Sequence, residues 1–381
     1  MFKKVTIFIL VDMIDVIDSI DELNSNIYHR YAENINSIIL VHPADIDNIC
    51  ERNYSVHNTL KSTGNTIIKN TLSVKPWWIT GFADGEGSFS IKKTNTINQK
   101  SSFSLEFKVT QHKVNENVLH AIKEYFKVGN VVIDNRETNT IKYQVQSNTH
   151  INKVIIPHFN NYPLVTSKHL DYVDWKNVSD ILIDKSKYTR EEITKIVIEK
   201  KQNMNNARSE YVRWAYLQKE CPSVLIQPNW LQGFIDAERT FQFDMGESNS
   251  RGKPYIRANP TIEIRQSNHD VIVLEIIKKY LRRGFLKPKF NIIDFTETIV
   301  SRAVSRYVRN DESAIIKFID EYPLMTNKNL DYLDWKRLIQ IKKEESHKTA
   351  EGFNKIKLIK ENINRGRAKL LYNYFNLYRL K

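Results

Sequence analysis

The sequence predicts a mixed α/β protein of the α+β class, built from two copies of one domain with the element order αββαββα. Two duplicated stretches predict the repeat. Residues 162–175 (YPLVTSKHLDYVDW) recur as residues 322–335 (YPLMTNKNLDYLDW), and residues 81–86 (GFADGE) recur as residues 233–238 (GFIDAE). Between these stretches, apolar and polar residues alternate as they do in strands. The two copies lie much further apart in the chain than the about 20 to 50 residues of a solenoid repeat, so each copy is a whole domain.

The duplication divides the chain into three parts. The first copy is predicted at residues 74–220 and the second at residues 221–381, related by a pseudo-twofold axis. Residues 1–73 have no copy and show no readable chemistry. One interpretation of this N-terminal extension is a remnant of translation fused to an upstream exon.

Hydrophobic periodicity predicts each element of the first copy. Strict alternation is typical of half-buried strands, whereas Val118, Ile122 and Phe126 recur every four residues, as on one face of a helix. The second copy repeats the same order. The elements predicted for the first copy are a helix at 77–84, strands at 88–92 and 103–109, a helix at 115–126, a strand at 141–146 and helices between 149 and 218.

The polar faces of these strands allow two interpretations. An antiparallel sheet commonly has one solvated face. In a basic chain, Lys, Arg, Gln, Asn and Ser on a sheet face are also the residues that read base edges in the major groove of DNA, and we favour DNA contact. The residues of this predicted surface are Ser88, Ser90, Lys92, Ser104, Lys108, Lys142, Gln144, Gln146, Gln242, Arg257, Asn259 and Arg265.

The composition indicates a folded, basic protein. Lys and Arg number 57 against 44 Asp and Glu, a net charge of +13, so nucleic acid is the first partner to consider, although a basic housekeeping protein carries similar charge. The longest apolar run, residues 7–11, is too short to span a membrane, and no membrane partner is expected. Cys50 and Cys221 allow neither a disulfide framework nor a four-thiolate zinc site. The low glycine content of 11 residues hints at an AT-rich, organellar coding sequence.

The first helix of each copy carries the predicted chemistry. Each helix has two small residues four positions apart, hence on one face, which lets two such helices approach closely. Their packing would bring Glu86 and Glu238 to one point. Neighbouring carboxylates repel unless a cation lies between them, and hard oxygen ligands suit Mg²⁺. The small residues of the predicted helix interface are Gly81, Gly85, Gly233 and Ala237.

These motifs resemble the paired signature helices of LAGLIDADG homing endonucleases, in the single-chain, two-repeat form encoded in organellar introns. Residues 78–89 (WITGFADGEGSF) fit the family pattern closely, and the resemblance covers about residues 74–340. It implies a four-stranded antiparallel saddle in each repeat, docked in the major groove of a long, pseudo-palindromic double-stranded DNA site. It also implies cleavage of both strands across the minor groove with short 3′ overhangs, a monomer, a group I intron as coding context and a mitochondrial location.

The resemblance further implies the roles of single residues. Two or three Mg²⁺ ions would be shared at the repeat interface by Glu86 and Glu238, helped by the carbonyls of Gly85 and Ala237. A glutamine at the end of the second strand would hold the attacking water, and a lysine from the duplicated loop would neutralise the transition-state phosphorane. The lysines could also be ordinary surface residues of a structural loop. The glutamines are Gln111 and Gln266, and the lysines are Lys168 and Lys328.

Two further pairs have structural interpretations. Asp84 and Asp236 precede the glutamates by two positions and should point elsewhere on the helix, which favours capping or hydrogen bonds between the repeats over metal binding. Trp175 and Trp335 lie at helical spacing from leucines and are predicted to be core residues.

The second motif departs from the family pattern, because Arg239 follows its glutamate where the first motif has Gly87. Glycine at a helix end serves as a left-handed cap, and another residue there costs about 1 kcal/mol. A guanidinium aimed at Glu238 would compete with the metal, whereas one turned outward would not. Two functions remain. One is an active DNA endonuclease, which is favoured because both glutamates, both glutamines and both lysines are present. The other is an RNA-binding intron maturase with lost or reduced cleavage. The maturase hypothesis rests on Arg239 and on the basic tail at residues 355–381, which could grip intron RNA or simply form an amphipathic helix.

Overall fold

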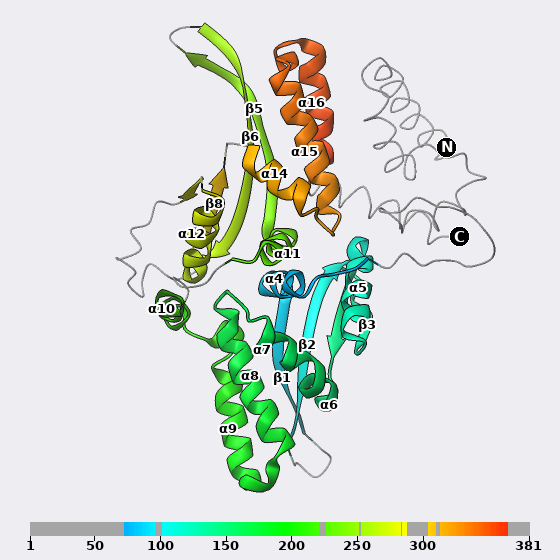
Figure 1. Cartoon of the computed structure of the whole chain (residues 1–381), viewed down its shortest axis with the longest axis vertical. Helices are drawn as coiled ribbons and strands as arrows, with labels where there is room; N and C mark the ends of the chain where they lie inside the picture. Colours follow the sequence, from blue (N-terminus) through cyan, green and yellow to red (C-terminus); the bar gives the residue numbers. More distant parts are fainter. Residues whose placement is uncertain are drawn as a thin grey trace, which may run out of the picture. The chain divides into compact units, whose positions relative to one another are not determined.

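The computed structural model describes residues 72–95, 101–220, 226–250, 253–282, 284–287, 304–309 and 313–364. They belong to one compact unit, Leu72–Lys381, drawn as ribbon in Figure 1. Nearly all of the predicted extension at residues 1–73 and the end of the predicted tail lie outside the described residues. Within the described part, no helix is long and apolar enough to cross a membrane.

The first repeat is an antiparallel sheet of four strands with helices packed on its apolar face. Its strand order is β1-β2-β4-β3, so the long hairpin of β1 and β2 pairs through β2 with β4. The elements are α4 (Pro76–Glu86), β1 (Gly87–Asn95), β2 (Ser101–His112), η1 (Lys113–Asn115), α5 (Glu116–Phe126), β3 (Asn130–Asn135), β4 (Thr140–Val145), α6 (Asn148–His150), the π-helical turn η2 (Ile151–Ile155), α7 (Ile156–Asn161), α8 (Lys168–Ile183), η3 (Lys185–Lys187), α9 (Arg190–Gln202), η4 (Asn205–Ala207) and α10 (Glu210–Glu220).

The second repeat has the same topology, with strand order β5-β6-β8-β7. Each sheet therefore begins with the helix-hairpin unit that carries a glutamate motif, and the predicted fold class is confirmed. The elements are α11 (Pro228–Glu238), β5 (Arg239–Ser250), β6 (Lys253–Ser267), η6 (Asn268–Asp270), α12 (Val271–Tyr280), β7 (Phe285–Lys287), β8 (Val304–Arg309), α14 (Ser313–Glu321), α15 (Lys328–Lys343), η8 (Ser346–Lys348) and α16 (Ala350–Asn362).

The predicted core tryptophans join each first strand to the long helix above it. Trp175 of α8 lies 5.2 Å, between ring centroids, from Phe89 of β1, and Trp335 of α15 lies 5.1 Å from Phe241 of β5. Both indoles are fully enclosed, with relative exposures of 0% and 1%. The aromatic side of each sheet thus forms the core, which leaves the polar side of the strands uncovered by these helices.

The two repeats meet where α4 and α11 lie side by side, as Figure 1 shows. A methyl group on Gly81 would overlap the carbonyl oxygen of Trp230, and one on Gly233 would overlap that of Trp78. The predicted small-residue interface is therefore present, since only hydrogen fits at these two crossing points.

The aspartates of the motif bind the opposite repeat. The Trp78 indole donates to Asp236 at 2.9 Å, and the Trp230 indole donates to Asp84 at 2.7 Å. Each carboxylate also accepts backbone N–H groups of the duplicated loop in its own repeat, for example that of Thr166 at 3.1 Å from Asp84. This bears out the prediction of hydrogen bonds between the repeats. It also fixes each loop, and the lysine that follows it, to the helix pair.

A further duplicated feature escaped the sequence comparison. Asn205 and Asn364 both have left-handed backbones, with φ of 54° and 58°. Their side-chain amides donate to the carbonyls of Phe89 and Phe241, at 3.1 and 2.6 Å, and so tie the end of each helical layer to the first strand. The only sequence signal is a shared Asn-x-x-Arg, too short to stand out without the fold.

Candidate active site at the repeat interface

Glu86 and Glu238 end the two central helices and converge at one place. A methyl group on Gly85 would lie 3.3 Å from a carboxylate oxygen of Glu238. Burial raises the pKa of Glu238, and the nearby charge of Glu86 raises it further. Because helix C-termini also carry partial negative charge, this end of the helix pair is a strongly cation-attracting point.

The two lysines lie at the same point, each as the first residue of its helix. The Lys168 ammonium donates to the carbonyls of Ala83 at 2.9 Å and Gly85 at 3.0 Å, and the Lys328 ammonium donates to the carbonyl of Ala237. Burial lowers the pKa of both ammonium groups. The interpretation of Lys168 and Lys328 as ordinary surface lysines is therefore wrong, since both are bound to helix ends next to the glutamates.

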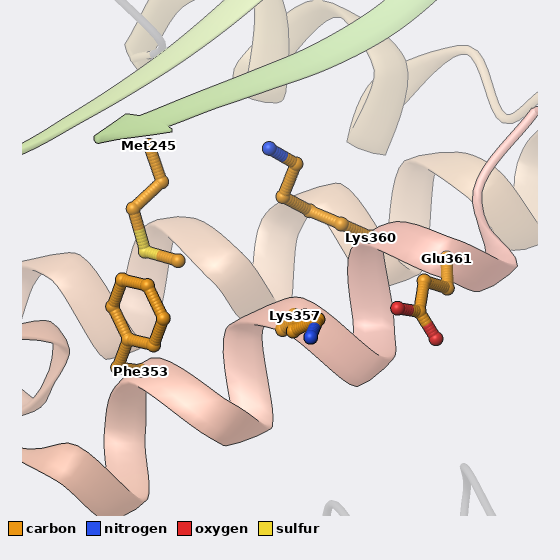
Figure 2. Close-up of a pocket in the computed structure, with 5 residues that line it drawn as sticks. All are labelled: Met245, Phe353, Lys357, Lys360 and Glu361. Carbon is orange, nitrogen blue, oxygen red and sulfur yellow. The ribbon is translucent and has the colours of Figure 1, made fainter.

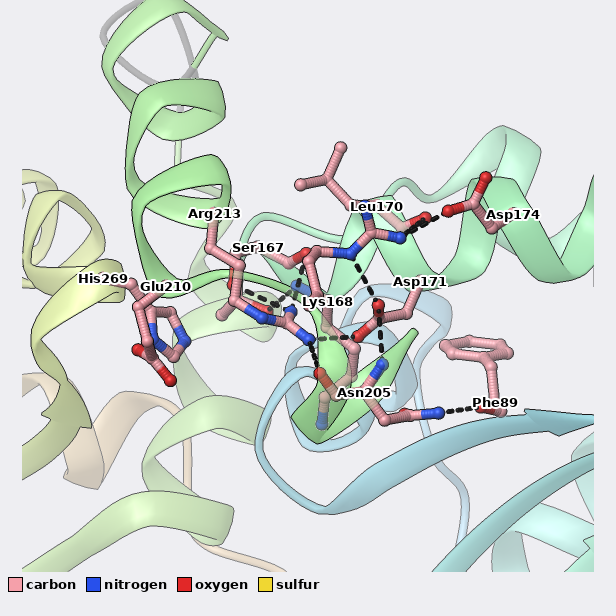
Figure 3. A network of polar contacts seen from close by, with 12 residues as sticks. Phe89, Ser167, Lys168, Leu170, Asp171, Asp174, Asn205, Glu210, Arg213 and His269 are labelled. Atoms are coloured by element: carbon pink, nitrogen blue, oxygen red, sulfur yellow. Dashed lines mark hydrogen bonds and ion pairs between the residues drawn. The ribbon is translucent and has the colours of Figure 1, made fainter. Parts of the chain in front are cut away.

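A network of ion pairs holds the start of α8. The Arg213 guanidinium, from α10, donates to Asp171 at 2.9 Å and to the carbonyl of Asn205 at 2.6 Å. Figure 3 shows Arg213, Asp171 and Asn205 turned toward one another beside Lys168. Because α10 precedes the second repeat in the chain, the segment that joins the two repeats also braces one of the site lysines.

The two glutamines differ in their partners. The Gln266 side chain forms a hydrogen bond with Glu238, whereas the Gln111 carbonyl oxygen accepts from the Asn115 amide at 2.9 Å. Both glutamines lie near the ends of their strands, and among the described residues a contact with a motif glutamate is recorded for Gln266. The two halves of the site are therefore chemically unequal in this structure.

Two residues that the sequence analysis missed link the repeats beside the glutamines. The Ser167 backbone N–H donates to Asp270 at 2.9 Å, and the Asn327 backbone N–H donates to the Asn115 side chain at 3.0 Å. Asn115 and Asp270 each follow the glutamine of their own repeat by four positions. Each therefore fixes the N-terminus of the helix that carries the lysine of the other repeat, and this shared spacing could have revealed them.

Arg239 behaves in neither of the two ways considered. It is 3% exposed, its guanidinium stacks 3.2 Å above the Phe241 ring, and it donates to the backbone carbonyl of Lys328 at 2.8 Å. The side chain thus points into the core, away from Glu238. The expected left-handed cap is also wrong: Gly87 and Arg239 have φ of −76° and −93°, ordinary extended backbone, so the arginine causes no backbone strain.

The predicted base-reading residues of the first repeat share one sheet face. Across the β1–β2 ladder Ser88 lies opposite Lys108 and Lys92 opposite Ser104, and Lys108 lies opposite Gln144 on β4. Lys142, Ser90 and Gln146 lie on the same face.

In the second repeat the equivalent face runs along β5 and β6. Asn259 lies opposite Asp244, and Gln242 lies opposite Thr261. Arg257 and Arg265 extend this face along β6 in the two directions from Asn259 and Thr261, and both are exposed.

The residues at the helix ends fit a magnesium site better than a zinc site. Among the residues that the structure describes, no group of three or more His, Cys, Asp and Glu side chains could hold a metal ion. The available ligands are two carboxylates and helix carbonyls, which already bind ammonium groups. Hard oxygen donors with room for water are the ligands that Mg²⁺ prefers, because it keeps several of its waters.

A pocket elsewhere in the second repeat is not this site. It lies between β5 and α16 and, within the described part of the chain, is lined by Met245, Phe353, Lys357, Lys360 and Glu361, as Figure 2 shows. None of the predicted site residues lines it.

Comparisons with known proteins agree with the fold. The model of the LAGLIDADG endonuclease family matches residues 79–179 and 231–339. The chain is 28% identical over 307 residues to "Probable intron-encoded endonuclease 3" of Neurospora crassa, covering 76% of this chain and 54% of that protein. It is 33% identical over 215 residues to "Probable intron-encoded endonuclease Cox1-I1b" of Schizosaccharomyces pombe, covering 56% of this chain and 50% of that protein.

Among solved structures, the homing endonuclease I-SmaMI matches with 27% identity and a TM-score of 0.64, over 77% of this chain and 98% of that one, in a crystal with cleaved DNA. A second I-SmaMI structure, bound to its uncleaved target in the presence of calcium ions, matches with a TM-score of 0.63 and 26% identity, over 77% of this chain and 99% of that one. Fold and site define a two-repeat protein with paired carboxylates at its pseudo-twofold axis. The chain belongs to the LAGLIDADG endonuclease family. It spans about half the length of the two fungal relatives.

Proposed function

We propose that this protein is a site-specific, Mg²⁺-dependent DNA endonuclease that cuts both strands of a long, pseudo-palindromic site. The observation that carries the proposal is the convergence of Glu86 and Glu238 at the ends of two helices packed through glycine. Two carboxylates on a pseudo-twofold axis match a substrate with two antiparallel strands, since each repeat can serve one scissile phosphate.

The residues of the site have distinct roles in this proposal. Glu86 and Glu238, with the carbonyls of Gly85 and Ala237, would hold the Mg²⁺ ions. Bound metal supplies an activated water and charge stabilisation at the leaving oxygen.

The polar residues around the metal ligands complete the proposed reaction. Gln111 and Gln266 orient the attacking water, because an amide both donates and accepts hydrogen bonds. Lys168 and Lys328 neutralise the phosphorane, since their ammonium groups already stand at the helix ends that the scissile phosphates would approach.

The partner in this proposal is double-stranded DNA, bound by one monomer whose two sheets lie in adjacent major grooves. The names of both fungal relatives, "intron-encoded", support an origin in a group I intron, and the glycine-poor composition supports a mitochondrial genome and location. The junction of the rejoined exons is then the natural target, because an intron-containing allele no longer carries it intact.

A cleavage assay on a supercoiled plasmid that carries this junction tests the proposal. Wild type should linearise the plasmid with Mg²⁺ and fail with EDTA. Glu86→Gln and Glu238→Gln should each lower the rate of double-strand cleavage by at least about a hundredfold. DNA binding should be largely preserved, because only a metal ligand is lost. Glu124→Gln, on the exposed surface of α5, is the matched control and should cut like wild type. Cleavage that survives both glutamate substitutions would refute the assigned metal ligands.

The maturase hypothesis is the alternative, and one of its two arguments no longer holds. An Arg239 that competes with the metal would favour it, but the guanidinium is bound to the Lys328 carbonyl instead. Tight binding of the intron RNA with promoted splicing, together with no cleavage of the junction, would favour the maturase.

A further inference from the structure

Each sheet buries one glutamate on the face that the proposed function assigns to DNA. Glu106 of β2 is 2% exposed and lies opposite Ser90, and Glu263 of β6 is 6% exposed and lies opposite Thr240. We call this pair the face glutamates. A carboxylate on a surface that meets phosphates repels them, so its presence in both sheets calls for a physical reason.

Glu106 is the acceptor for three side chains of the same face. Its carboxylate accepts from the Lys92 ammonium at 2.7 Å, from the Gln146 amide at 2.6 Å and from the Ser90 hydroxyl at 3.5 Å. Burial alone would raise the pKa of Glu106, but the hydrogen bonds from Lys92 and Gln146 outweigh it and lower the pKa. The group therefore stays ionised and fixes its neighbours from beneath.

Glu263 is built in the same way around an arginine. One carboxylate oxygen accepts from Nε and Nη2 of Arg265, at 3.1 and 2.8 Å, and from the Gln242 amide at 3.3 Å, while Arg306 lies 3.8 Å away. The side chains of Lys92 and Arg265 remain 47% and 45% exposed. In both sheets the anion is buried and the cation that it holds stays at the surface.

This arrangement suits the recognition of guanine. In the major groove guanine presents two neighbouring acceptors, O6 and N7, and Arg or Lys is its usual partner. An unrestrained cation on this surface would reach a phosphate as readily as a base. A carboxylate beneath the cation fixes its position and repels phosphate oxygens, while the neutral edge of guanine is still accepted.

We propose that Glu106 and Glu263 are specificity-determining positioning residues that hold Lys92 and Arg265 for the readout of one guanine in each half of the DNA site. The inference rests on the proposed function, because it assumes that these faces meet duplex DNA.

The face glutamates are not at equivalent positions, which makes the proposal sharper. Glu106 precedes Gln111 by five residues, whereas Glu263 precedes Gln266 by three. Two strand residues span about 7 Å, and base pairs follow one another every 3.4 Å or so along the duplex. The guanine read by the second repeat should thus lie about one or two base pairs closer to the centre of the site.

Selection from a duplex library tests this. The full chain would be incubated at fixed salt with duplexes randomised over both half-sites, and bound molecules would be sequenced. Wild type should enrich guanine at one position in each half. Glu106→Gln and Glu263→Gln should each reduce that guanine preference about tenfold in one half only, with the other half and the melting temperature unchanged. Lys92→Met and Arg265→Met should affect the same two positions and so assign each half to a repeat. Glu124→Gln, on a helix of the opposite layer, should leave the profile unchanged.

The outcomes separate the two proposals. If wild type enriches no sequence, the proposed function itself fails. If wild type enriches a site but both glutamine variants keep the guanine preference, or lose enrichment equally in both halves, the positioning role is refuted. If a glutamine variant does not fold, the variant of its partner, Lys92→Met or Arg265→Met, tests the proposal instead. Lys92→Met or Arg265→Met with an unchanged profile overturns the proposal, and loss of one guanine in one half supports it.

Discussion

Arg239 is a cation buried beside the second half of the site without pointing into it. Its Nε and Nη1 atoms are buried and have no hydrogen-bond partner among the residues that the structure describes, and burial lowers its pKa to about 9. What remains is stacking on Phe241 and one hydrogen bond to the carbonyl of Lys328. The residue therefore acts as packing beneath the start of α15, with an electrostatic penalty that an apolar side chain would avoid.

A pair of substitutions at this position tests that interpretation. Arg239→Met keeps an unbranched chain on Phe241 and removes the buried charge, so its free energy of unfolding should match wild type or exceed it by about 1 kcal/mol. Arg239→Gly leaves a cavity and should destabilise the protein by about 2–4 kcal/mol. Urea unfolding measures both. A methionine variant less stable than the glycine variant would mean that the charge itself is required.

At the scale of elements, the crossing of α4 and α11 depends on single hydrogen atoms. Gly81→Ala places a methyl group inside the Trp230 carbonyl, so the helices must separate and the motif glutamates with them. We expect a loss of more than about 3 kcal/mol of stability, and a loss of cleavage. Gly246→Ala in β5 is the matched control, because its methyl group meets no atom within 4 Å. Equal thermal unfolding of the two variants would contradict the close packing.

A titratable contact joins η6 of the second repeat to α10 and α8. His269 is paired with Glu210 and lies 3.4 Å from Asp270, the residue that accepts from the Ser167 backbone. Figure 3 shows His269 beside Glu210. Burial lowers the pKa of His269, but Asp270 and Glu210 outweigh this and raise the pKa above its usual value.

The sign of this shift predicts a pH dependence. The folded state binds the His269 proton more tightly than the unfolded state. The contribution of His269 to folding stability is therefore complete below its unfolded pKa of about 6.5, and it is lost as the pH rises through the pKa of the folded state. His269→Asn should therefore lower the melting temperature by about 2–4 °C at pH 6 and by less than about 1 °C at pH 9. An equal decrease at both pH values would indicate a purely steric role.

Across the whole molecule, each repeat contributes residues to the hydrophobic core of the other, as well as to the candidate active site. Val165 and Leu217 precede the second repeat in the chain but lie in its hydrophobic core, and Ala237 of the second repeat lies in the core of the first. The two polar faces are therefore held by one continuous structure. A DNA duplex would meet both as a unit.

The net charge of +13 predicts how that contact responds to salt. If each sheet lies along a major groove, several phosphates are neutralised, and affinity for the target should fall at least about a hundredfold between 50 and 200 mM salt. Lys142→Ala, on the polar face of β4, should weaken binding and reduce the slope against log salt by about one. Lys127→Ala, at the end of α5, is the control and should not. A flat salt dependence of wild type would remove the phosphate contacts from the proposal.

The sequence by itself determined the features that repeat or alternate. Alternation set the strands, the spacing of Gly81 and Gly85 predicted the helix interface, and duplication singled out Glu86 and Lys168, because a short pattern found twice at a domain-sized distance is rarely accidental. The place of Asp84 on an ideal helix argued against metal binding and left helix capping or a hydrogen bond between the repeats, of which the structure shows the second.

Only the tertiary structure decided how side chains from distant segments meet. In the sequence Arg239 stands next to Glu238, which suggests a competitor for the metal. In the structure its guanidinium packs on Phe241 and binds the Lys328 carbonyl instead. Asn115 and Asp270 gain their meaning from distant partners, the backbone of Asn327 at a separation of 212 residues and that of Ser167 at 103. The face glutamates gain theirs from neighbouring strands, because Glu106 binds Gln146 at a separation of 40 residues and Glu263 binds Gln242 at 21. Local periodicity reports which face of an element is apolar. Hydrogen bonds across the pseudo-twofold axis depend on where two surfaces cross, and the chain encodes that crossing only through its packing.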